Sequence, residues 1–221
     1  MALAIFDLDN TLLNGDSDHA WGEFLCEKGI VDVQEYRKAN DYFYHQYVDG
    51  SLDIKEFLNF ALKPLKTHTA AQLNEWHAQF MIEKVMPMMQ PTALSKLAEH
   101  REKGDFLLII TATNLFVTKP IAQFLDVDDI LATDPEVVDG EYTGNISGTP
   151  CFQAGKITRL QQWLKGNDYT LDGSYFYSDS RNDLPLLELV DHPVVVDGDD
   201  YLLKTAAEKG WPAISFRYSH S

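Results

Sequence analysis

The chain has 221 residues, of which 45% are hydrophobic and 24% charged, as is typical of a soluble globular protein with one sizeable domain or a core and a companion. The formal net charge of −16 argues against a nucleic-acid partner, because nothing offsets repulsion from a phosphate backbone, although a bound metal can still admit a small anionic substrate. Two cysteines without a metal-binding spacing, and no apolar run long enough to span a bilayer, predict a cytoplasmic protein that does not enter a membrane.

The first predicted element is a buried strand at residues 3–6, a short apolar run that ends abruptly at acidic residues. From about residue 16 to residue 86 the apolar residues recur only at helical spacing, and Thr69 is placed to cap one of the helices. Gly50 and Pro64 separate helices within this stretch. Because no strand pattern occurs in it, we expect an all-helical insertion.

After Pro87 the pattern alternates between strands and helices. We expect strands at 106–110, 130–132, 175–177, 193–196 and 213–216, a small hairpin at 142–146, and helices at 91–104, 120–125, 155–164, 184–189 and 201–209. This alternation predicts an α/β fold with a doubly wound parallel sheet that is covered by helices on both faces. The sheet would be built from residues 1–14 and 87–221, and residues 15–86 would form an inserted helical cap.

Polar residues fall where predicted strands end or predicted helices begin, at the edge of the sheet where ligands bind in such folds. They are Asp7 and Asp9 after the first strand, Thr111 and Asn114 after the second, Lys156 at the start of a helix, and Asp179 and Asp183 after a later strand. Each group alone is weak evidence, since acids after a strand are often solvated loop residues or helix caps. Their occurrence at four such places predicts a single site.

These residues resemble the four motifs of the haloacid dehalogenase (HAD) superfamily, in particular its phosphoserine-phosphatase-like branch, subfamily IB. Residues 6–12 resemble the first motif and residues 109–114 the second, with a helical cap of the C1 type between them. Lys156 fits the third motif, and Asp179 with Asp183 fits the fourth. The resemblance covers essentially the whole chain and implies a Rossmann-like core with Mg²⁺-dependent phosphatase activity.

The resemblance implies that Asp7, Asp179 and the backbone carbonyl of Asp9 hold Mg²⁺, a cation that prefers oxygen ligands. Asp7 would attack phosphorus and form an aspartyl-phosphate. Asp9 would protonate the leaving alkoxide and then deprotonate the water that releases phosphate. An acid at position 9 favours rapid turnover of an alkyl phosphate, whereas transport ATPases of the superfamily have Thr there.

Phosphoryl transfer depends mainly on positioning and on neutralising charge, so a phosphate cradle is expected beside the nucleophile. Thr111 and Lys156 would hold phosphate oxygens and stabilise the charge of the transition state, and Asn114 lies in the same motif as Thr111. Asp183 would orient Lys156 and a metal-bound water without touching the substrate.

The predicted cap would close over a small phosphate ester, and it argues against a polymeric substrate. Asp16 stands nine residues after Asp7 (16 − 7), where phosphoserine phosphatases have a carboxylate that faces the substrate ammonium. Asp16 is equally well explained as the cap of the first inserted helix, and both roles can hold. Asp16 and Asp18 beside Trp21 suit a cationic substrate that carries a ring, although packing in the cap core explains Trp21 as well.

Two features count against phosphoserine as the substrate. The second motif has Ala112 and Thr113 where that enzyme has glycines, and Arg37 is the only arginine in the predicted cap. The whole pattern, including residues 16–21 and 150–153, resembles bacterial histidinol-phosphate phosphatases, so histidinol phosphate, from histidine biosynthesis, is the leading expectation. Phosphoserine or another small metabolite is the alternative, and a phosphotransferase, a mutase or a non-catalytic binding module are alternatives of a different class. The sequence gives no signal for the oligomeric state.

Overall fold

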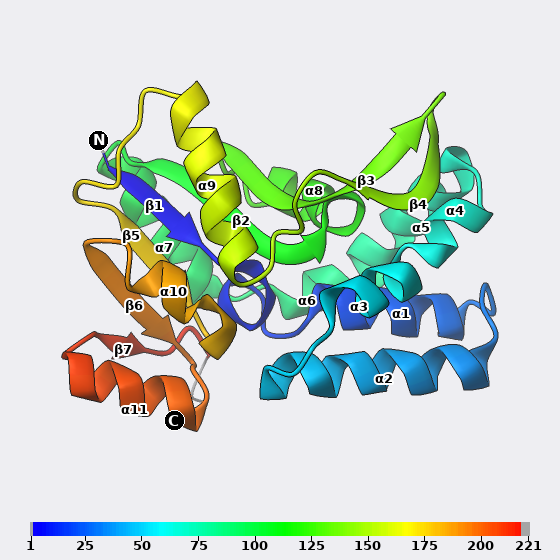
Figure 1. Cartoon of the computed structure of the whole chain (residues 1–221), viewed down its shortest axis with the longest axis horizontal. Coiled ribbons are helices and arrows are strands. Elements are labelled where there is room, and N and C mark those ends of the chain that lie inside the picture. The colour runs from blue at the N-terminus through cyan, green and yellow to red at the C-terminus, as the bar shows by residue number, and fades with distance from the viewer. Residues whose placement is uncertain (1, 218–221) are drawn as a thin grey trace.

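The core of the protein is a seven-stranded sheet with the strand order β4-β3-β2-β1-β5-β6-β7. Figure 1 shows the computed structural model, which describes residues 2–217. The strands are β1 (Leu3–Phe6), β2 (Phe106–Asn114), β3 (Asp129–Val138), β4 (Glu141–Ser147), β5 (Tyr175–Ser178), β6 (His192–Val196) and β7 (Ala213–Ile214). All neighbours are parallel except β3 and β4, which form an antiparallel hairpin. The predicted α/β fold with a parallel sheet is confirmed.

Helices account for the rest of the regular structure. They are α1 (Ser17–Glu27), α2 (Val33–Asp49), α3 (Ile54–Ala61), α4 (Lys63–Thr67), α5 (Ala70–Phe80), α6 (Met86–Met88), α7 (Pro91–Glu102), α8 (Leu115–Phe124), α9 (Ala154–Gly166), α10 (Leu184–Leu187) and α11 (Asp200–Lys209). Three short irregular helical turns lie at residues 8–12, 81–85 and 181–183. None of the helices within residues 2–217 combines the length and the apolar character that crossing a bilayer requires.

Strand β1 lies at the centre of the sheet, and its side chains belong to the hydrophobic clusters on both faces of the sheet. Side chains alternate along a strand, so Leu3 and Ile5 join one hydrophobic cluster, and Ala4 and Phe6 join the other. Helices α9, α10 and α11 pack in the first cluster, whereas α7 and α8 pack in the second. Burial on both faces explains why β1 reads as an unbroken apolar run rather than an alternating one.

Between Ser17 and Met88 helices are the only regular elements, and most of them lie in the right half of Figure 1. The helices begin where the sequence offers caps, since Asp16, Asp32 and Asp53 each accept a backbone N–H of the helix that follows. Thr69 and Gln72 form a reciprocal capping box at the start of α5, as the sequence predicts.

The chain leaves and re-enters the core at adjacent points. Leu13 pairs with Met89 in an isolated antiparallel bridge, and the Asn14 N–H donates to the Met88 carbonyl at 2.8 Å. We therefore propose the division into a core of residues 1–14 and 87–221 and a cap of residues 15–86, with the last four core residues outside the described part. Helix α6 crosses this proposed boundary.

Three elements, β2, α8 and β3, are several residues longer than the sequence predicts. Strand β2 continues to Asn114, and α8 begins at Leu115 with Pro120 inside it, because the Asn114 side chain accepts the Val117 N–H and caps the helix there. Strand β3 continues to Val138 because its second half leaves the central sheet to pair with β4.

Candidate active site

The carboxyl ends of β1 and β5 bring Asp7 and Asp179 to the same edge of the sheet. The strands are parallel neighbours, and the Asp7 N–H donates to the Tyr177 carbonyl at 2.9 Å. Thr11 joins the two loops, because its hydroxyl donates to Asp179 Oδ1 and accepts the Asp179 N–H, both at 3.1 Å. Thr11 was not among the predicted site residues, since a hydroxyl inside a loop carries no pattern of its own.

Lys156 lies fully buried between two carboxylates. Its Nζ donates to Asp7 Oδ1 at 2.9 Å and to Asp183 Oδ2 at 2.8 Å. The Ser178 hydroxyl donates to Asp183 Oδ2 at 2.7 Å and holds that carboxylate in place. Burial alone would lower the pKa of Lys156, but Asp183 and Asp7 outweigh it and raise the pKa, so the side chain is an ammonium. The first turn of α9, which begins at Ala154, positions it.

The residues around Asp7 fit a divalent cation. Asp7 Oδ2 is buried and has no hydrogen-bond partner among the described residues. Burial raises the pKa of Asp7 to about 7, although Lys156 opposes the shift, and burial with the charge of Asp7 raises the pKa of Asp179 well above its usual range. The buried Asp7 carboxylate and the half-buried Asp179 carboxylate repel each other, and one Asp7 oxygen has no hydrogen-bond partner among the described residues. Such a donor set suits an oxygen-preferring cation such as Mg²⁺.

Asp9 is held by both the core and the cap. The Ser17 N–H, from the first turn of α1, donates to Asp9 Oδ1 at 2.6 Å, and the Thr113 hydroxyl donates to Oδ2 at 2.8 Å. Burial, followed by the charge of Asp16, raises the pKa of Asp9 to about 7. A carboxyl group with such a pKa can both give and accept a proton near neutral pH.

Thr111 is buried at the end of β2 and lines the same pocket as Asp9. Its hydroxyl oxygen accepts the Thr113 N–H at 3.2 Å, which leaves its own hydrogen free to donate to another group.

The predicted contact of Asn114 with phosphate stays a prediction, and its side chain already has two other partners. Its side-chain oxygen caps α8, its amide lies 3.4 Å from Asp18 Oδ1 of the cap, and it is not among the residues that line the pocket. Both polar groups of Asn114 therefore have partners, in a strand that runs four residues past its expected end.

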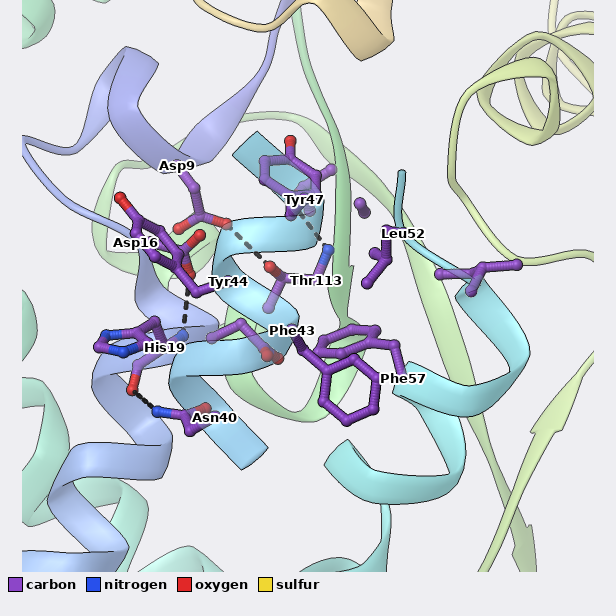
Figure 2. Close-up of a pocket in the computed structure, with 14 residues that line it drawn as sticks. Asp9, Asp16, His19, Asn40, Phe43, Tyr44, Tyr47, Leu52, Phe57 and Thr113 are labelled. Atoms are coloured by element: carbon purple, nitrogen blue, oxygen red, sulfur yellow. Dashed lines mark hydrogen bonds between the residues drawn. The ribbon is translucent and has the colours of Figure 1, made fainter. Parts of the chain in front are cut away.

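A pocket lies between the core and the cap beside Asp9, with a cavity volume of about 40 Å³ (Figure 2). Two kinds of side chain dominate its lining, namely carboxylates and aromatic rings. The carboxylates are Asp9, Asp16 and Asp18, and the rings are Phe43, Tyr44 and Tyr47 of α2 and Phe57 of α3. None of the described residues that line it is a lysine or an arginine. The pocket is thus acidic and aromatic, and too small in this conformation for more than a few waters.

The structure confirms one of the two roles that the sequence left open for Asp16, the helix cap, and contact with a substrate ammonium stays a prediction. Asp16 caps α1 by accepting the His19 N–H at 2.8 Å, and it also lines the pocket. Asp18 lines the pocket beside it. Burial raises the pKa of both carboxyl groups, and the charge of Asp16 raises that of Asp18 further. A cation in the pocket would relieve this repulsion.

Trp21 packs in the cap core, which is one of the two explanations that the sequence allows. Its side chain is buried in the cap and packs against Phe24, Phe80 and Phe116 with ring centroids 5.2–5.5 Å apart. It is not among the pocket residues, so it is part of the cap core rather than a substrate contact. The aromatic wall comes instead from α2, where Phe43, Tyr44 and Tyr47 at positions i, i+1 and i+4 share a helix face. That spacing was readable in the sequence.

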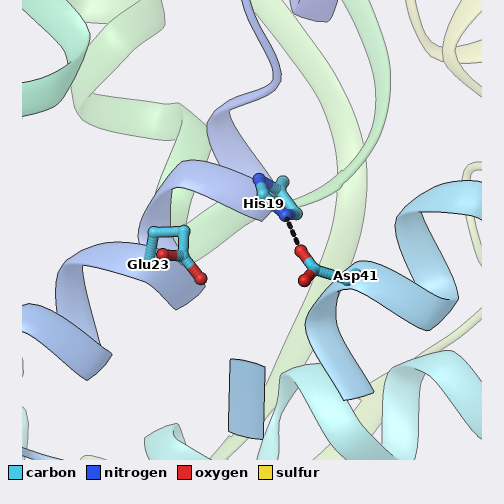
Figure 3. A group of neighbouring side chains, drawn as sticks. All are labelled: His19, Glu23 and Asp41. Atoms are coloured by element: carbon cyan, nitrogen blue, oxygen red, sulfur yellow. Dashed lines mark hydrogen bonds and ion pairs between the residues drawn. The ribbon is translucent and has the colours of Figure 1, made fainter. Parts of the chain in front are cut away.

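His19, Glu23 and Asp41 form a small group where α1 meets α2 (Figure 3). His19 Nε2 lies 2.9 Å from Asp41 Oδ1, and the Glu23 carboxylate is paired with Arg37 at 3.0 Å. These pairings join the two helices, and we assign the group a structural role.

Comparison with known proteins identifies the family. Residues 4–188 match the family described as haloacid dehalogenase-like hydrolase. The chain belongs to this family. A histidinol-phosphatase from Neisseria meningitidis serogroup C (strain 8013) is 48% identical over 219 residues, which cover 97% of this chain and 99% of that protein. Membership of the family, together with this similarity, makes the chain a phosphatase.

Solved structures agree on the fold. A protein of unknown function from Bordetella pertussis Tohama I has a TM-score of 0.92 and 42% sequence identity, with 98% of this chain and 99% of that chain covered. A phosphoserine phosphatase in the form of a phospho-aspartyl intermediate analogue has a TM-score of 0.71 and 15% identity, with 99% and 94% covered. At that identity the likeness concerns the fold of the family alone.

Proposed function

We propose that this phosphatase hydrolyses a small phosphomonoester through an aspartyl-phosphate on Asp7. The observation that carries the proposal is the buried Asp7 carboxylate, which has one oxygen on the Lys156 ammonium and the other unpartnered. An Asp7 oxygen attacks phosphorus and the bond from phosphorus to the ester oxygen breaks, while Asp9 gives its proton to the departing alkoxide. Water then attacks phosphorus, Asp9 takes a proton from it, and the bond to Asp7 breaks.

The positive charge that this reaction needs comes from two sources. The Lys156 ammonium and the Thr111 hydroxyl donate to phosphate oxygens and stabilise the charge of the transition state. Mg²⁺, held by Asp7, Asp179 and the backbone carbonyl of Asp9, would neutralise the repulsion between the phosphate and the carboxylate that attacks it. The Asp183 side chain keeps Lys156 oriented throughout.

The pocket beside Asp9 supports an amino-alcohol phosphate as the substrate, with histidinol phosphate as the leading candidate. A substrate ammonium would face Asp16 and Asp18, and a ring would lie against the aromatic wall of α2 and α3. Similarity to a protein named histidinol-phosphatase supports the same substrate. Phosphoserine fits less well, because its carboxylate would meet three carboxylates in a pocket whose described lining holds no lysine or arginine.

The test is a comparison of kcat/KM for histidinol phosphate, phosphoserine and sugar phosphates with Mg²⁺ present. We expect histidinol phosphate to exceed phosphoserine by at least about 100-fold, which corresponds to about 2.7 kcal/mol of transition-state binding. A flat profile would contradict the substrate assignment, and normal turnover by Asp7→Asn would contradict the mechanism. Acceptor alcohols added to the same assay would reveal a phosphotransferase as a phosphorylated acceptor.

A further inference from the structure

Thr113 makes a contact that the four motifs do not account for. Its hydroxyl donates to Asp9 Oδ2 at 2.8 Å, and its side chain is 6% exposed at the end of β2 (Figure 2). The two residues lie in different motifs, with Asp9 in the turn that follows β1 and Thr113 near the end of the neighbouring strand β2. The contact therefore joins the group that transfers protons to the strand that also carries Thr111.

The two oxygens of Asp9 are held from opposite sides. The Ser17 N–H holds Oδ1 and the Thr113 hydroxyl holds Oδ2, so rotating the carboxyl plane breaks both hydrogen bonds. Ser17 contributes a backbone group that no substitution short of proline removes. Thr113 contributes a side chain, and it is branched at Cβ, which restricts its first side-chain torsion in a strand. Of the two hydrogen bonds that hold the Asp9 carboxylate, the one from Thr113 is therefore the one that a substitution can remove.

We propose that Thr113 is a positioning residue for the proton transfers of Asp9, because its hydroxyl fixes the carboxyl plane and so decides which lone pair faces the leaving oxygen. This inference rests on the proposed function, in which Asp9 is the general acid and base. Thr113 acts through Asp9 and need not touch the reacting atoms. Small misplacement of a proton donor is costly, since general acid catalysis contributes about 10²–10⁴-fold and requires hydrogen-bond geometry.

The test separates proton transfer from the rest of the reaction by changing the leaving group. Thr113→Val removes the hydroxyl at nearly constant volume, and Thr113→Ser keeps it. Single-turnover release of the alcohol, with enzyme in excess and Mg²⁺ present, is measured for p-nitrophenyl and p-methoxyphenyl phosphate. These esters have similar shapes, but p-methoxyphenolate is far more basic and depends on a proton from Asp9.

We expect Thr113→Val to slow p-methoxyphenyl phosphate by on the order of 100-fold while p-nitrophenyl phosphate changes less than about threefold, and Thr113→Ser to restore most of the loss. Equal slowing of both esters, no slowing of either, or failure of Thr113→Ser to restore the rate would overturn the inference. If Thr113→Val does not fold, the pair Thr113→Ala and Thr113→Ser gives the same comparison.

Failure of the proposed function would look different. In that case the unaltered protein would release neither alcohol in an Asp7-dependent manner, and the Thr113 variants would have nothing to change. Asp7→Asn in the same assay therefore tells which of the two ideas is at fault.

Discussion

Lys156→Met tests whether the buried ammonium is the charge that holds the catalytic loops together. Methionine has a similar length but no charge, so the substitution removes the hydrogen bonds of 2.9 and 2.8 Å to Asp7 and Asp183. The lysine is 1% exposed, so water cannot replace it. Removing one partner of a buried ion pair costs about 3–5 kcal/mol, and we expect a loss of that size in the free energy of unfolding at pH 8.

The loss in the free energy of unfolding caused by Lys156→Met should be smaller at low pH, because Asp7 can then be protonated. Its pKa in the folded protein is already raised to about 7 from 3.8 with Lys156 present, and without Lys156 it rises further. A raised carboxyl pKa contributes stability that is fully present below the unfolded pKa and is lost as the pH rises through the folded pKa. At pH 5 the variant can therefore protonate Asp7 and avoid much of the cost.

Urea unfolding at pH 5 and pH 8, with EDTA in both buffers, measures the two free energies. Lys209→Met is the matched control, because Lys209 also has a carboxylate partner, Glu188 at 2.8 Å, but both side chains are at least 40% exposed. We expect that surface variant to lose less than about 1 kcal/mol. A Lys156→Met protein as stable as the control at pH 8, or one that loses more at pH 5 than at pH 8, would refute the reasoning.

Three further predictions follow from the site and the core. Mg²⁺ should raise the melting temperature more at pH 8 than at pH 5, because protons compete with the cation for Asp7, whose pKa is raised to about 7. Equal shifts of the melting temperature at the two pH values, measured by differential scanning fluorimetry, would contradict a cation site on that carboxylate. Asp18→Asn should lower kcat/KM for histidinol phosphate by about 10- to 100-fold, because it removes a carboxylate that faces the substrate ammonium. The kcat/KM for p-nitrophenyl phosphate, which has no ammonium, should change less than about threefold, and equal losses for both substrates would indicate general damage to the site. Burial lowers the pKa of His100, which lies between Asp105 and Tyr177, so the stability that His100 itself contributes should fall as the pH drops below about 6.5. The difference in the free energy of unfolding between the unaltered protein and His100→Gln, measured with urea, should therefore shrink over that range, and a constant difference would contradict the prediction.

Much of the fold could be predicted because the spacing of the apolar residues and the positions of the residues that cap or end helices indicate the same elements. Strand β1 and the helical stretch that follows it are visible as an apolar run and as helical spacing, and Thr69 caps α5 as its position suggests. The end of β2 could not be predicted, because Asn114 can end a strand or cap a helix and only the packing of α8 decides between them.

The site residues of the core could be predicted better than those of the cap. Residues that follow strands, such as Asp7 and Asp179, are brought to one edge by sheet topology alone, and the structure places Asp7 beside Lys156. Residues of the cap depend on how helices cross, which the sequence does not state. The sequence therefore left Trp21 open between a substrate contact and the cap core, where the structure places it, and Tyr44 with the rest of the wall on α2 was not singled out.

The adjacency of Leu13 and Met89 has a consequence for how the protein folds. Strand β1 pairs in register with β2 although roughly 100 residues separate the two partners, and closing so long a loop carries an entropic cost that grows with the logarithm of its length. A cap whose helices form first brings Asn14 and Met88 together and shortens the effective loop to roughly 30 residues, which lowers that cost by about 1 kcal/mol. Loss of contacts inside the cap should therefore slow refolding of the whole sheet, even at positions far from any strand.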